Sequence, residues 1–108
     1  MDKNEVLQQE RTKLYEIFAD VDPSKRKLVE GLIEDAAFLR AENHVLRQQL
    51  AITGMVKIHP NNPELQKPVE TGKQYLKNIN SYSVIIKTLN GILAKNEIED
   101  DDDLSEFE

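Results

Sequence analysis

Cysteine and tryptophan are both absent from this chain of 108 residues. Without cysteine there can be no disulfide framework, no thiol nucleophile and no thiolate ligand for zinc. Aromatic residues make up only 6% of the chain and hydrophobic residues 39%. We therefore expect an intracellular protein with a thin core, for which oligomerisation would bury additional surface.

Long apolar stretches are also missing. No run of about 18 apolar residues could form a membrane span, and the first ten residues lack the apolar segment of a signal peptide. A length of 108 residues is that of one small domain, which excludes a two-domain enzyme. We expect a protein that has no membrane partner and stays in the cytoplasm.

The net charge of −6 is unevenly distributed along the chain. Residues 97–108 hold eight acidic side chains and no basic one, whereas residues 1–96 hold 12 acidic and 14 basic side chains and carry +2. Because like charges repel, we predict one domain over 1–96 and a flexible acidic tail over 97–108. The tail either docks on a basic partner, or mimics DNA phosphates and so screens a basic surface from DNA, or only solubilises the chain. The residues predicted to bind a partner are Asp100, Asp101, Asp102, Asp103, Leu104 and Phe107.

Helical spacing of apolar residues predicts one helix over 3–18 and a second over 24–53. Asp22 and Pro23 suit the N-cap and first position of the second helix, and Gly54 suits its C-terminal end.

A third helical region is predicted after a short extended connector over 55–63, with Asn62 and Pro63 restarting the helix. Pro68 should kink or restart this third helix, because proline lacks an amide donor.

Apolar residues of the second predicted helix recur in alternating steps of three and four, the pattern of a coiled-coil seam. A helix of about 30 residues spans roughly 45 Å, more than a compact domain of this size can bury. Asn43 would fix the register by pairing with another Asn, or lie wet at a partly covered position. We predict self-association through Val29, Leu32, Leu39, Asn43, Leu46 and Leu50. The predicted fold is all-α: a long, hairpin-like helical protomer with a short extended connector and a disordered acidic C-terminal tail, assembling as an oligomer.

Catalytic and metal-binding patterns are not found. His44 flanks the seam and His59 precedes a proline, and the two are not at the spacing of metal ligands. No phosphate-binding glycine loop, nucleophile elbow or zinc-protease helix occurs, and the run of four aspartates lacks the alternation and glycine of a calcium loop. We predict a protein that is not an enzyme and has no metal or cofactor.

Three cations, Lys25, Arg26 and Lys27, cluster at the start of the second predicted helix. Cations at a helix N-terminus interact unfavourably with the helix macrodipole, so their presence there indicates a second role that offsets this cost. Binding of DNA phosphates is one such role, and a solvated face is the alternative. The predicted DNA-binding residues are Lys25, Arg26, Lys27, Lys67, Lys73 and Lys77.

Three successive segments carry a family resemblance: DPSKRKLVEGLIEDAAFLRAENHVLRQQL, GMVKIHPNNPELQKPV and GKQYLKNINSYSVIIKTLNGIL. Together they resemble the small terminase subunits of tailed double-stranded DNA phages and prophages, in the cohesive-end siphophage group. The resemblance covers roughly residues 20–93. The chain departs from other small terminase groups in lacking a recognisable N-terminal helix-turn-helix, and its overall charge is acidic.

The resemblance implies a non-catalytic subunit that recognises the packaging site in viral double-stranded DNA, in the cytoplasm of a bacterial host. It also implies self-association as a ring of about eight to ten copies. The large terminase subunit, which carries the ATPase and nuclease, would be recruited or regulated by this chain. Two alternatives are a coiled-coil adaptor or scaffold that does not bind nucleic acid, and a small dimeric transcription regulator.

Overall fold

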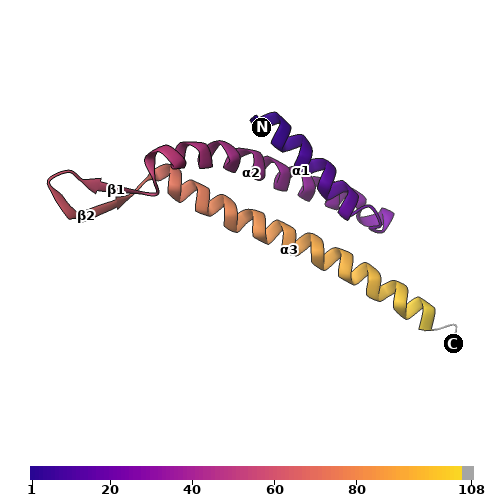
Figure 1. Cartoon of the computed structure of the whole chain (residues 1–108). Coiled ribbons are helices and arrows are strands. Elements are labelled where there is room, and N and C mark those ends of the chain that lie inside the picture. Colours follow the sequence, from indigo (N-terminus) through magenta and orange to yellow (C-terminus); the bar gives the residue numbers. More distant parts are fainter. Residues whose placement is uncertain (106–108) are drawn as a thin grey trace.

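The structure, a computed structural model, describes the backbone of residues 1–105 and the side chains of residues 1–95. It is an elongated molecule of 74 × 29 × 17 Å between Cα atoms (Figure 1). The elements are α1 (Lys3–Ile17), the short 3-10 helix η1 (Pro23–Lys25), α2 (Arg26–Thr53), β1 (Val56–His59), β2 (Asn62–Pro68) and α3 (Glu70–Ser105). The predicted helical class is confirmed, although a small two-stranded sheet means that the fold is not all-α.

Local signals place the ends of α1 and α2 close to their predicted positions. The Asp2 carboxylate accepts a hydrogen bond from the Glu5 N–H at 2.8 Å and caps α1. Asp22 caps η1, directly before α2, by accepting from the Ser24 N–H at 3.0 Å. Gly54 ends α2 with a φ of 76°, a conformation that glycine adopts without a steric penalty. Both predicted helices are confirmed.

The sheet is an antiparallel hairpin that joins α2 to α3 (Figure 1). The predicted extended conformation is confirmed over β1, but the predicted helix start is wrong, because Asn62 and Pro63 begin strand β2 and α3 begins only at Glu70. Val56 lies opposite Pro68, so Pro68 closes the strand instead of kinking a helix. Prolines disfavour the helical conformation of the preceding residue, and the facing strand β1 supplies hydrogen bonds that an extended chain can use.

The long helix α3 continues from Glu70 to Ser105, past the predicted tail boundary at residue 97. The predicted disordered tail is therefore wrong for the backbone up to Ser105. No glycine or proline follows Gly91, so no strong helix breaker ends α3 earlier. Residues 100–104 of the predicted partner-binding segment lie on the last turns of α3, and Phe107 lies outside the described residues.

The core lies where α2 is covered by the two other helices. α2 runs antiparallel to both α1 and α3 and packs against each of them (Figure 1). Among the described residues, Ile33 of α2 and Leu89 of α3 are the largest fully buried side chains. The buried core cluster consists of Leu14, Phe18, Val21, Val29, Ile33, Ala36 and Leu89.

The predicted seam of α2 is covered within the chain. Val29 is 4% exposed and Leu50 is 9% exposed, while Leu32, Leu39 and Leu46 are half-buried. The expectation that α2 is too long to find a partner in its own chain is wrong, because the chain is elongated rather than compact and α3 lies alongside α2. Self-association through the seam remains a prediction, now restricted to its half-buried positions.

Asn43, a buried polar residue of the seam, finds its partner in α3. The Asn78 side-chain N–H donates to the Asn43 carbonyl oxygen at 2.9 Å, and Gln74 donates to Asn78 at 2.8 Å. Asn43 is 8% exposed and Asn78 9% exposed. The amide pair therefore sets the register of α2 against α3 within one chain. Neither predicted alternative for Asn43, pairing between two copies or a wet position, describes this buried contact.

Replacing Asn78 by alanine should lower the free energy of unfolding by about 1–3 kcal/mol, because the buried Asn43 amide loses its donor. Replacing both Asn43 and Asn78 by leucine should recover most of this loss, because no polar group then stays unpaired. Urea unfolding of Asn43→Leu, Asn78→Leu and the double leucine variant measures the coupling. Strictly additive losses would contradict a direct pair.

Candidate functional site

The six predicted DNA-binding residues fall into two separate groups. Lys25, Arg26 and Lys27 lie where η1 passes into α2, whereas Lys67 lies on β2, and Lys73 and Lys77 lie near the start of α3. Between the groups lies α2, whose 28 residues span about 42 Å. One chain therefore presents cations towards both ends of α2 rather than in one patch.

The group at the start of α2 lies in the sequence between Asp22 and Glu30. The first turn of α2 contains no acidic residue, and no side chain caps the helix at Lys25. Arg26 and Lys27 are exposed, and neither forms an ion pair among the described residues. Hydrogen bonds from the Ser24 N–H and hydroxyl hold the pKa of Asp22 below its ordinary value, with a smaller contribution from Lys25. This arrangement suits binding of an anion such as phosphate.

The group at the hairpin contains a pair of like charges. Lys57 lies directly opposite Lys67 in the antiparallel register, and both side chains are exposed. Like charges at directly opposed positions destabilise a strand pair, so an anionic partner would relieve the repulsion. Lys73 differs, because Glu70 pairs with it at 3.2 Å. Lys57 was not predicted as a DNA-binding residue, since only the strand register places it beside Lys67.

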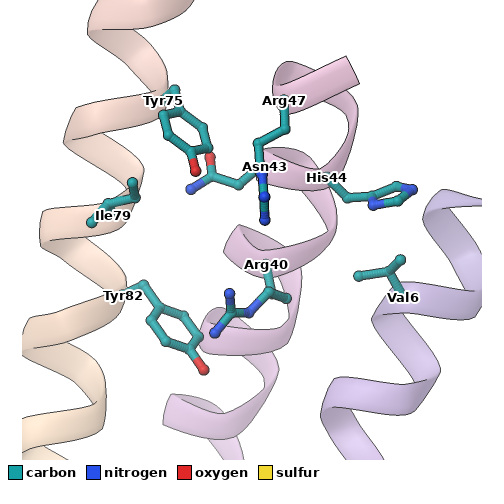
Figure 2. Close-up of a pocket in the computed structure, with 8 residues that line it drawn as sticks. All are labelled: Val6, Arg40, Asn43, His44, Arg47, Tyr75, Ile79 and Tyr82. Carbon is teal, nitrogen blue, oxygen red and sulfur yellow. The ribbon is translucent and has the colours of Figure 1, made fainter. Parts of the chain in front are cut away.

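A cavity of about 310 Å³ over the face of α2 was not predicted from the sequence. Figure 2 shows its walls: α2 carries a row of polar and basic side chains, and α3 carries a row that is mostly aromatic. Both rows repeat at helical spacing, which is the one sequence signal that could have indicated them. The lining residues are Val6, Arg40, Asn43, His44, Arg47, Tyr75, Ile79 and Tyr82.

At one end of this cavity, a buried carboxylate joins all three helices. Glu10 of α1, which is 6% exposed, accepts a hydrogen bond from the Tyr82 hydroxyl of α3 at 2.5 Å. Lys13 pairs with Glu10 at 2.7 Å, and Arg40 of α2 approaches it at 3.8 Å. The Arg40 guanidinium also lies 4.5 Å from the centre of the Tyr82 ring, within range of a cation–π interaction.

The charges at this contact shift two pKa values in opposite directions. Burial acts to raise the pKa of Glu10, but hydrogen bonds from Lys13 and Tyr82 outweigh burial, so this pKa lies below its ordinary value. Burial, and then the Glu10 carboxylate, raise the pKa of the Tyr82 hydroxyl. Glu10 is thus held charged and Tyr82 neutral, and Glu10 neutralises part of the charge of Arg40.

The other end of the cavity keeps an uncompensated cation. Arg47 is exposed and has no ion-pair or hydrogen-bond partner among the described side chains. The Nε2 atom of His44 lies 2.7 Å from the Met1 carbonyl oxygen and 3.3 Å from Gln48 Nε2. It donates to the Met1 carbonyl in one tautomer and accepts from the Gln48 amide in the other. Arg47 is therefore the cation in the cavity that is free to bind an added anion.

The two histidines lie on different elements, His44 on α2 and His59 on β1. His59 Nδ1 accepts a hydrogen bond from the Asn61 N–H at 3.1 Å in the hairpin turn. Within residues 1–95, no group of three or more acidic or histidine side chains is placed to hold a metal ion. No helix in the described part of the chain has an apolar stretch long enough to cross a membrane.

No family model, no curated protein and no solved structure matches the chain.

Replacing Glu10 by glutamine should lower the free energy of unfolding at pH 7 by about 1–2 kcal/mol, because Lys13, Arg40 and Tyr82 then face a neutral amide instead of a carboxylate. A carboxylate whose pKa is lowered on folding stabilises the fold above its unfolded pKa of about 4.3, and this contribution is lost as the pH falls through the folded pKa. The difference from the parent chain should therefore shrink in acid. Chemical unfolding between pH 7 and pH 3 tests this. The exposed Glu16, replaced in the same way, is the control and should show no such difference.

Proposed function

We propose that this chain is the non-catalytic DNA-recognition subunit of a viral genome-packaging terminase, acting in the cytoplasm of a bacterial host. It would bind the packaging site in viral DNA and recruit or regulate the large ATPase and nuclease subunit. The observation that carries the proposal is the cationic group at the start of α2, where Arg26 and Lys27 are exposed without acidic partners in the first turn of the helix. Such cations oppose the macrodipole in the free protein and would be stabilised by phosphate.

The hairpin supplies a second contact of the same kind. Lys57 and Lys67 repel each other across the strands, and both face solvent. An isolated two-stranded hairpin is only marginally stable in water. A partner that binds the exposed hairpin would therefore stabilise it. Several copies would multiply these contacts, and the affinity for DNA grows with each phosphate that is neutralised.

Assembly into a ring is supported by the shape of the chain. A thickness of 17 Å between Cα atoms leaves few side chains fully enclosed, and large apolar side chains stay exposed on α2, including Leu28 at 59% and Phe38 at 57%. These apolar side chains would lose contact with water if copies of the chain packed through α2.

The test combines the molar mass with DNA retention. Light scattering at micromolar concentration should give a ring of about eight to ten copies. Duplex fragments tiled across the viral genome should be retained, with affinity falling steeply as salt rises. A monomer that retains no DNA below about 100 mM salt would contradict the proposal. An oligomer indifferent to DNA would favour the coiled-coil adaptor, and a large ATPase–nuclease gene beside this gene would support the terminase.

A further inference from the structure

We propose that the cavity between α2 and α3 binds the acidic segment 104–108 of a second copy of the chain. This contact would define which surfaces join neighbouring copies. The inference rests on the self-association in the proposed function, but not on DNA binding.

The lining of the cavity combines unlike side chains, which together select a mixed ligand. α2 contributes the free guanidinium of Arg47 with Arg40, and its His44 points towards Val6 of α1, while α3 contributes Tyr75, Ile79 and Tyr82 (Figure 2). Guanidinium groups bind carboxylates through paired, charge-assisted hydrogen bonds, while the α3 wall offers apolar and aromatic contact. The lining therefore suits a carboxylate next to an aromatic side chain.

The size of the cavity points to a short peptide segment. A volume of about 310 Å³ is at the lower end of the range for small-ligand pockets, and is far too small for a DNA double helix. One aromatic side chain with its flanking carboxylates is of the right order. Phosphates of duplex DNA would meet the exposed lysines outside instead.

The chain itself contains a segment of this chemistry. Residues 104–108 read LSEFE, with Phe107 between Glu106 and Glu108, and they follow four consecutive aspartates. Residues 1–96 carry a net charge of +2 and residues 97–108 carry eight acidic side chains, so attraction between the body of one copy and the tail of another is expected.

The same copy cannot supply this segment. From Tyr82 in the cavity wall, α3 runs away for 23 further residues to Ser105, a distance of about 35 Å. The three residues 106–108 span only about 10 Å even when fully extended. A tail bound in the cavity would therefore come from a second copy. The tail of one copy would contact the cavity of the next, so the contact joins two different surfaces and is heterologous. Heterologous contacts can close a ring.

A disulfide experiment tests this contact directly, because the chain has no cysteine of its own. Ile79→Cys and Ser105→Cys are made in two full-length chains with tags of different size, and the chains are mixed under mild oxidation. Ile79 lines the cavity, and Ser105 precedes the acidic-aromatic residues without being one of them. Disulfides form only when the two Cα atoms come within about 7 Å of each other.

The mixed disulfide should form at least about 10-fold faster than with Thr12→Cys, a matched control on the exposed surface of α1. Adding Arg47→Glu to the Ile79→Cys chain should remove the advantage, and combining it with Glu106→Lys and Glu108→Lys on the other chain should restore it. Equal rates for Ile79→Cys and Thr12→Cys would overturn the inference.

The companion measurements separate the possible failures. Equal rates with an intact oligomer would overturn only this contact, whereas equal rates with a monomer would overturn self-association as well. If Arg47→Glu weakened retention of DNA and left the disulfide rate unchanged, the cavity would be a DNA contact and the inference would fail.

Discussion

Replacing Lys25, Arg26 and Lys27 together by glutamine should lower the affinity for duplex DNA roughly 100-fold at 100 mM salt. Each lost phosphate contact removes about 0.9 from the slope of log affinity against log salt, so three contacts remove nearly 3 for each engaged copy. Fluorescence anisotropy over a salt series measures both the affinity and the slope.

The fold should not suffer from this triple change. Cations at the start of α2 oppose the macrodipole, so their removal should leave the free energy of unfolding unchanged or raise it by a few tenths of a kcal/mol per residue. Lys87→Gln is the matched control, because Lys87 is an exposed lysine of α3 outside both cationic groups. An unchanged affinity in the triple variant would mean that these side chains are only solvated.

Replacing Ile33 by alanine should lower the free energy of unfolding by about 3 kcal/mol, within a range of about 2–5 kcal/mol. Ile33 is 1% exposed and lies in the cluster that joins α2 to both other helices. Small domains are stable by only about 5–15 kcal/mol, so one cavity in a thin core removes a large share. Thermal and urea unfolding at matched protein concentration measure the loss.

Ile17→Ala is the control for this core position. Ile17 is the last residue of α1 and is 53% exposed, so its truncation should cost no more than about 0.5 kcal/mol. An equal cost for both variants would contradict the described packing within one chain.

Helix formation in this chain follows from signals within a few residues of each other. The apolar spacing of α1 and α2, the Asp22 cap and the positive φ of Gly54 could all be predicted, because each depends on backbone conformation at one place. Strand β2 could not be predicted, because Asn62 and Pro63 also resemble a helix start, and the deciding hydrogen bonds come from β1.

The side-chain contacts between different elements depend on tertiary packing and not on the helical spacing within one element. The spacing of the α2 seam is the same whether it faces another copy or the chain's own α3, so periodicity could not show that Asn43 pairs with Asn78, 35 residues away. For the same reason the Arg47 cavity and the Lys57–Lys67 pair emerge only once two elements are set side by side. Composition and short-range periodicity therefore establish a helical chain with an acidic end. Which side chains meet depends on long-range contacts, because neither the register nor the relative placement of two elements is encoded within either one alone.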